Sequence, residues 1–155
     1  MTKTIDDKLR ELKIILPEAP APAANYVPTV LIGDILYVSG QISANSNGLI
    51  TGKLGATMNV EDGTKAARAC AINLLSHVKS ACNGNLERLV RVVKLTGFVN
   101  STPDFIDQPK IINGASDLLV NLLESRGHHS RSAVSAASLP LGVAVEIEGI
   151  FQIRP

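Results

Sequence analysis

Aromatic residues and an excess of charge of either sign are what this sequence lacks most. It contains no tryptophan, two tyrosines and three phenylalanines, and its 15 lysines and arginines nearly balance 14 aspartates and glutamates. Proteins that bind nucleic acids usually neutralise phosphates with a basic stripe and stack bases on aromatic side chains. The cations here are spread among carboxylates, and the aromatic residues form no stacking pattern. We therefore expect no nucleic-acid partner.

Long apolar runs are also missing. No stretch reaches the roughly 18 residues that a membrane-spanning helix needs. Residues 1–7 do not have the charged, apolar and small-residue segments of a secretory signal. We expect a cytoplasmic protein without a membrane partner.

Cysteine is scarce, with only Cys70 and Cys82 in the chain. If both lie on one helix, their separation corresponds to about 18 Å along the helix axis, which is too far for a disulfide bond. Neither belongs to a CxxC pair or to a Cys/His cluster with metal-site spacing. We interpret both as small core residues and expect no metal site.

Apolar residues, in contrast, are plentiful enough for one hydrophobic core. They make up 45% of the 155 residues, which is typical of a single globular domain over 1–155. A short helix, capped by Thr4 and ended by Pro17, is expected to dock on this domain as a helical extension over about residues 1–17. The proline-rich stretch 17–28 then serves as an extended connector.

Hydrophobic periodicity predicts the order ββαβαββ for the rest of the chain. The expected strands cover residues 30–32, 35–38, 89–99, 132–138 and 143–153, and the expected helices cover residues 60–83 and 105–126. Two amphipathic helices and five strands predict an α+β fold with both helices on one face of a sheet. The second face of the sheet is then uncovered, which favours oligomerisation through it.

Two carboxylates near the C-terminus are the first candidates for chemistry. Side chains alternate along strand 143–153, so Glu146 and Glu148 share a face and lie roughly 7 Å apart. Arg131, near the start of the preceding strand, would bring a fixed cation close to them if the two strands pair. The same residues also fit a solvated strand face with a surface ion pair. Both interpretations stay open at this point.

The three histidines are interpreted as structural. His77 is expected on the surface of its helix, and His128 and His129 form a polar helix end near the negative pole of the helix dipole. The sequence has no serine in a nucleophile elbow, no phosphate-binding glycine pattern and no zinc-type histidine spacing. From the residues alone, we expect an oligomeric α+β protein with an Arg/Glu polar site.

Several segments resemble the signatures of the RidA/YjgF family of reactive-intermediate deaminases. This sequence resembles the C-terminal signature of the family in three segments: Arg-Ser-Ala-Val at 131–134, Leu-Pro at 139–140 and Val-Glu-Ile-Glu at 145–148. The N-terminal signature is similar to Val-Ser-Gly-Gln-Ile at 38–42, and residues 113–119 resemble the longer branch of the family. The resemblance covers about residues 19–153.

This resemblance implies a chorismate-mutase-like α+β fold, in which a mixed sheet carries two helices packed on one face. It further implies a homotrimer with sites at the subunit interfaces. The implied activity is hydrolysis of 2-imino acids, tautomers of the enamines released by pyridoxal-phosphate enzymes, to 2-keto acids and ammonia. The resemblance implies no cofactor for this reaction.

Individual residues receive roles from the same resemblance. Arg131 matches the arginine whose planar fork binds the substrate carboxylate, and Glu146 matches the acid that positions or activates the attacking water. The other matched positions are substrate-binding: Tyr26, which closes the pocket, Ser39, Gly40, Asn113, and Ala133, which stands where many relatives have cysteine.

Two other functions remain open. One is a noncatalytic trimer that binds a small carboxylate through the same arginine pocket. The other is the endoribonuclease or translation-inhibitor role attached to some relatives. The near-neutral charge and the few aromatic residues argue against the second of these.

Overall fold

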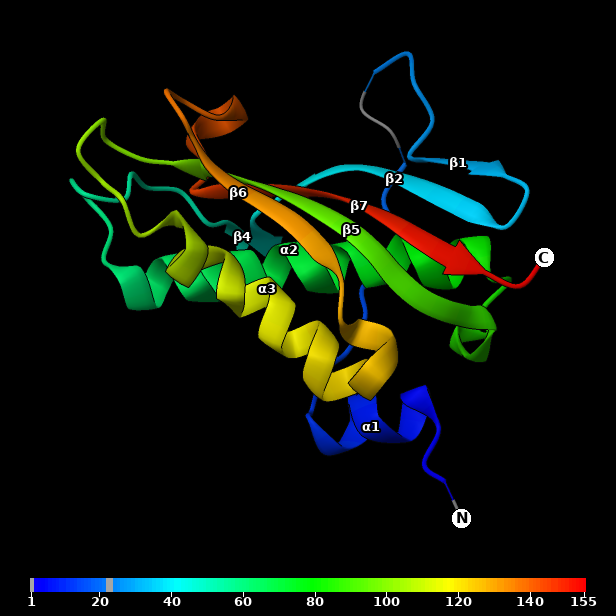
Figure 1. Cartoon of the computed structure of the whole chain (residues 1–155). Coiled ribbons are helices and arrows are strands. Elements are labelled where there is room, and N and C mark those ends of the chain that lie inside the picture. The colour runs from blue at the N-terminus through cyan, green and yellow to red at the C-terminus, as the bar shows by residue number, and fades with distance from the viewer. Residues whose placement is uncertain (1, 22–23) are drawn as a thin grey trace.

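The computed structural model of the chain describes residues 2–21 and 24–155, in which a five-stranded sheet carries two long helices (Figure 1). The helical segments are α1 (Ile5–Glu11), α2 (Val60–Ala81) and α3 (Gln108–Leu123), with short 3-10 turns η1 (Leu86–Arg88), η2 (Glu124–Gly127) and η3 (Pro140–Gly142). The strands are β1 (Thr29–Ile32), β2 (Ile35–Ile42), β3 (Ala44–Asn45), β4 (Gly48–Leu49), β5 (Leu89–Asn100), β6 (Ser130–Ala136) and β7 (Val145–Ile153). The predicted α+β class is confirmed.

The sheet is mixed, with the strand order β1-β2-β7-β5-β6. Strand β6 runs parallel to β5 at one edge, and the other neighbouring pairs are antiparallel. Helices α2 and α3 cover the same face of this sheet (Figure 1), as the sequence predicted. We call this the helix face. The opposite face, the open face, carries exposed apolar side chains such as Ile32 and Tyr37.

Local sequence signals start both long helices. Asn59 caps α2 by accepting a hydrogen bond from the Asp62 backbone N–H at 2.8 Å, and Pro109 stands in the first turn of α3. The two helices then cross in close contact, because a Cβ on Gly114 of α3 would collide with the Thr64 carbonyl of α2. Because the two helices lie so close together, their buried apolar side chains pack with those of the sheet in one core on the helix face.

Three predicted helix ends were wrong, each for a local reason. Helix α1 ends at Glu11 and not near Pro17, because Lys13 adopts a left-handed φ of 55° and the Ile14 N–H bonds to the Leu9 carbonyl at 2.9 Å. Helix α3 begins at Gln108 and not at Phe105, because a proline ring is tolerated only in the first helical turn. Helix α3 ends at Leu123 and not at residue 126, because Glu124 adopts a positive φ of 55°.

The prediction for His77 was also wrong, whereas that for the cysteines is confirmed. Cys70 and Cys82 are buried, free thiols. His77 is buried at 3% exposure, and its Nε2 lies 3.1 Å from Oε1 of Gln41 in β2. His77, which was predicted on the surface of α2, therefore lies buried between α2 and the sheet, where it contacts Gln41.

Candidate active site

The predicted site residues divide between the two faces of the sheet. A Cβ built on Gly97 in β5 would lie 2.5 Å from Ile112 of α3, so position 97 points to the helix face. Ala133 pairs with Gly97 in the parallel ladder, so Ala133, and with it Arg131 two residues earlier, lies on the helix face. Glu146 pairs with Phe98, the next residue along β5, and therefore lies on the open face.

Three predicted residues form the open-face half of the site, namely Ser39, Gly40 and Glu146, and Tyr26 lies on the segment that leads into β1. The β2–β7 ladder is interrupted between Val38 and Gln41, and Gly40 lies in this irregular stretch. The Glu146 side chain lies directly over Gly40: a Cβ there would stand 3.0 Å from Cδ and 3.2 Å from Cγ of Glu146, and closer still to Oε1. Only a glycine leaves the carboxylate in this place.

Tyr26 lies next to two residues whose carbonyl groups accept hydrogen bonds from Ser39. The Ser39 N–H donates to the Pro28 carbonyl at 2.9 Å, and the Ser39 hydroxyl donates to the Val27 carbonyl at 3.4 Å. Tyr26 directly precedes Val27 and is half exposed. The hydrogen bonds of Ser39 thus hold the segment that carries Tyr26 beside β2.

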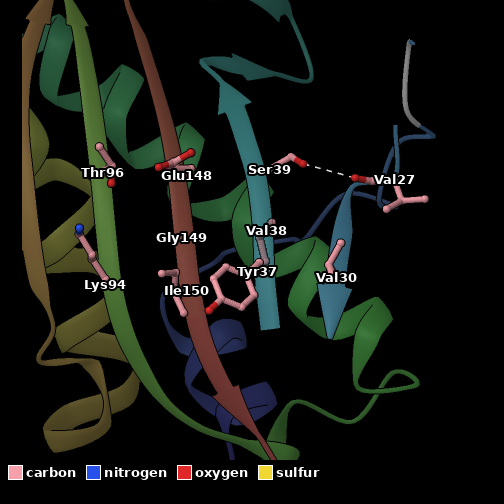
Figure 2. A pocket seen from close by; sticks show the side chains of 10 residues that line it. All are labelled: Val27, Val30, Tyr37, Val38, Ser39, Lys94, Thr96, Glu148, Gly149 and Ile150. Atoms are coloured by element: carbon pink, nitrogen blue, oxygen red, sulfur yellow. Dashed lines mark hydrogen bonds between the residues drawn. The ribbon is translucent and has the colours of Figure 1, made fainter. Parts of the chain in front are cut away.

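Glu146 has the electrostatic surroundings of a proton acceptor. Partial burial raises the pKa of its carboxyl above the usual glutamate range, and the nearby charge of Glu148 raises it further. Both residues lie on one face, as the alternation predicted, but they face different surroundings. Glu148 lines a cavity of about 350 Å³ on the open face together with Lys94 and Thr96 of β5 (Figure 2).

Three predicted residues form the helix-face half: Asn113, Arg131 and Ala133. Arg131 donates from Nη1 to the Ser116 hydroxyl at 3.0 Å and from Nη2 to the Pro109 carbonyl at 3.2 Å. Pro109, Asn113 and Ser116 are spaced four and three residues apart, so they form one stripe along α3. Asn113 is exposed on this stripe, between the two partners of Arg131.

The predicted approach of Arg131 to the glutamates within one chain is wrong. Strand β5 lies between β6 and β7, so the strands that carry Arg131 and Glu146 do not pair. The two side chains also project from opposite faces. Each half of the site is assembled within the chain, but the halves are separated by the sheet.

Sequence reasoning missed several polar residues around these halves. Gln41 donates from Nε2 to the Ser39 carbonyl at 3.0 Å and thereby links the open-face half to His77. Ser116 binds Arg131 and also contacts His129 Nε2 at 3.0 Å. Sequence spacing could have indicated both residues as neighbours of the site. Ser116 follows Asn113 at a helical spacing of three, and His129 precedes Arg131 at the two-residue spacing of a strand face.

Two other classes of site can be checked in residues 2–21 and 24–155. Within this part of the chain, no helix combines the length and apolar character that crossing a membrane requires. In the same residues, histidine, cysteine, aspartate and glutamate form no group of three or more that fits a metal ion.

Comparison with known proteins identifies the family. A family profile described as "YjgF/chorismate_mutase-like, putative endoribonuclease" matches residues 6–148. The chain belongs to the YjgF/RidA family. Protein TCP17 of Trypanosoma cruzi is 48% identical over 148 residues, which are 94% of this chain and 92% of TCP17. A 2-iminobutanoate/2-iminopropanoate deaminase of Dermatophagoides farinae is 30% identical over 91% of this chain and 95% of that protein.

A solved structure is also similar to this chain in fold. The crystal structure of Atu1372 from Agrobacterium tumefaciens, a protein described as having unknown function, matches with a TM-score of 0.90 and 44% identity over 97% of this chain and 94% of that one. The family profile names a chorismate-mutase-like protein, which confirms the fold that the family resemblance implied. Members of this family carry both deaminase and endoribonuclease descriptions.

Proposed function

We propose that this protein hydrolyses reactive 2-imino acids to 2-keto acids and ammonia, in a homotrimer whose sites lie between subunits. The observation that carries the proposal is the Glu146 carboxylate, which lies over the Gly40 backbone with a raised pKa. A general base works best when its pKa approaches the pH of operation. The deaminase description of a 30% identical relative supports the same reaction.

Arg131 is proposed to bind the substrate carboxylate. A guanidinium carries five N–H groups in a rigid fork and pairs with a carboxylate through two of them. The bonds to Ser116 and Pro109 fix the orientation of this fork before substrate arrives. Such a charge-assisted pair contributes about 1.5 to 3 kcal/mol to binding.

Glu146 is proposed to activate water for attack on the imine carbon. The carboxylate takes one proton from the water as the new C–O bond forms, the electron pair of the C=N bond moves to nitrogen, and the carboxylate returns its proton to that nitrogen. The hydroxyl proton of the resulting carbinolamine then moves through the same carboxylate to the amine nitrogen, the C–N bond breaks so that ammonia leaves, and the electron pair of the O–H bond completes the keto group. Because the imine carbon is already electrophilic, positioning of water and substrate accounts for much of the acceleration.

The separation of the two halves supports a ring of subunits. One substrate contacts both Arg131 and Glu146 only if they come from different chains, since the sheet lies between them within one chain. The helix-face half of one chain would meet the open-face half of the next, which is a contact between unlike surfaces. Contacts of this type close into rings when the rotation between neighbouring subunits closes, as we propose here for three subunits. The exposed apolar residues Val30, Ile32 and Tyr37 lie on β1 and β2 beside the open-face half and favour burial there.

A coupled assay tests the proposed reaction. An amino-acid oxidase or dehydratase generates a small aliphatic 2-imino acid in place, and its disappearance is followed with and without the protein. Wild type is expected to accelerate hydrolysis, and Glu146→Gln is the matched control because it keeps the shape of the side chain but cannot accept the proton. Light scattering should show a trimer at micromolar concentration. Equal rates with and without the protein, or a stable monomer, would contradict the proposal.

Ribonuclease activity is the second candidate, because the family description names an endoribonuclease. The balanced charge of the chain does not favour binding to phosphates. RNA cleavage by wild type that is lost in Arg131→Ala would support this second function. Cleavage that persists in Arg131→Ala would indicate a contaminating nuclease.

A further inference from the structure

The helix-face half contains a chain of hydrogen bonds that extends beyond the residues the family signatures cover. Arg131 Nη1 donates to the Ser116 hydroxyl at 3.0 Å, and the same hydroxyl lies 3.0 Å from His129 Nε2. His129 Nδ1 lies 2.6 Å from the Gly127 carbonyl. The three side chains come from α3, from β6 and from the loop before β6, so this contact joins separate elements.

In this series of hydrogen bonds, the donors and acceptors follow from the chemistry of the first and last groups, the Arg131 guanidinium and the Gly127 carbonyl. Arginine only donates, so the Ser116 oxygen accepts from Arg131 and its hydrogen is left for His129 Nε2. A carbonyl only accepts, so His129 Nδ1 carries a proton toward Gly127. Every contact is satisfied when His129 is neutral, with its proton on Nδ1.

Protonation of His129 would disturb this arrangement. A proton on Nε2 would turn that nitrogen into a donor, and Ser116 would then have to accept from two cations at once. The surroundings oppose this state: burial lowers the pKa of His129, and the charges of Arg131 and His128 lower it further, although the Gly127 carbonyl acts in the opposite direction. From α3, the group that faces the ring is the uncharged Ser116.

We propose that Ser116 and neutral His129 are positioning residues that hold the Arg131 guanidinium ready for a carboxylate. This inference rests on the proposed function, in which Arg131 binds substrate. Neither residue is expected to touch the reacting atoms. Their contribution should therefore affect KM more than kcat, because the interaction with the substrate carboxylate already exists in the ground state.

Substitutions at Ser116 test the hydroxyl. Ser116→Ala removes one hydrogen bond to a charged group and should raise KM about 5- to 10-fold, with kcat changed less than about twofold. Ser116→Thr keeps the hydroxyl and should restore most of the affinity. A merely structural role would instead lower the fraction of folded protein and leave KM of the folded fraction unchanged.

Substitutions at the histidines test the protonation state. For wild type, KM should rise as the pH falls through the lowered pKa of His129, below the usual histidine range. His129→Gln keeps an acceptor for Ser116 but cannot be protonated, so its KM should stay flat across the same pH range. His128→Gln is the matched control, because this exposed neighbour is also a histidine but lies outside the hydrogen-bond chain. This variant should keep the rise of KM at low pH, moved to somewhat higher pH because one charge that lowers the pKa of His129 is gone.

Two readouts do not depend on catalysis. Nitrogen NMR of the imidazoles should show His129 with its proton on Nδ1, and calorimetry should show 2-oxobutanoate binding that weakens in Ser116→Ala. If wild type binds 2-oxobutanoate in this manner but hydrolyses no imine, the proposed function fails and the positioning role stands. A proton on Nε2 of neutral His129, or equal affinities of wild type and Ser116→Ala, overturns the positioning role. If wild type does not bind 2-oxobutanoate at all, Arg131 is no carboxylate site and both proposals fall.

Discussion

The smallest change that separates the chemistry from the fold is Gly40→Ala. The backbone of Gly40 does not adopt the left-handed φ that would require glycine, so alanine fits its conformation. The added methyl group would instead meet the Glu146 side chain, 3.0 Å from Cδ and 3.2 Å from Cγ. Since Glu146 is half-buried and its carboxylate is the flexible end of a side chain, the carboxylate would rotate away and the strands would stay in place.

For Gly40→Ala, we expect a large loss of activity but only a small change in stability. A displacement of about 1 Å at a reacting group costs on the order of 100-fold in rate, so imine hydrolysis should fall by about this factor. The free energy of unfolding should change by less than about 1 kcal/mol, because alanine also restricts the unfolded chain more than glycine does. Activity would thus be lost in a protein of normal stability.

A double-mutant cycle decides whether the loss acts through Glu146. Turnover and urea unfolding are measured for wild type, Gly40→Ala, Glu146→Gln and the double variant. If the methyl group acts by displacing the carboxylate, Gly40→Ala should add almost nothing in the Glu146→Gln background. Additive losses, or a Gly40→Ala variant with full activity, would refute the assigned role of Glu146.

Three further predictions concern other parts of the molecule. Arg131→Lys keeps the charge but loses the fork, so kcat/KM should fall about 10- to 100-fold at an unchanged melting temperature, and wild-type activity in Arg131→Ala would show that the site is misplaced. Because the pKa of Glu146 is raised by folding, its ionisation opposes folding above that pKa. Glu146→Gln should therefore raise the melting temperature at pH 7, and this gain should vanish as the pH falls below the usual glutamate range; a gain that persists there would contradict the assignment. We also propose that α1 is a docked part of one domain, so Ile5→Ala, at 1% exposure, should cost about 2 to 5 kcal/mol in urea unfolding, whereas Ile15→Ala, at 89% exposure, should cost almost nothing.

The sequence predicted the elements well because their signals are local. Hydrophobic periodicity located α2 and the two strands of the β1–β2 hairpin. The predicted end of α1 failed because a backbone conformation decided it: nothing in the identity of Lys13 indicates that it takes the left-handed conformation that ends α1. Non-glycine residues adopt that region rarely.

For the candidate site, the residue types could be predicted but their arrangement could not. Alternation placed Glu146 and Glu148 on one face, yet which strands neighbour each other is a long-range property. The insertion of β5 between β6 and β7 moved Arg131 away from both glutamates. His77 was misjudged for a related reason, because its partner Gln41 comes from a distant strand.

The location of Arg131 and Glu146 on opposite faces also makes the proposed activity depend on how much protein is present. An isolated chain keeps the two groups apart, so dilution below the dissociation constant of the ring would switch the reaction off without unfolding any subunit. Specific activity would then rise with concentration and level off once the rings are complete. Mixed rings would show complementation: Arg131→Ala chains and Glu146→Gln chains, each inactive alone, would together regain part of the activity wherever an intact half of one meets an intact half of the other.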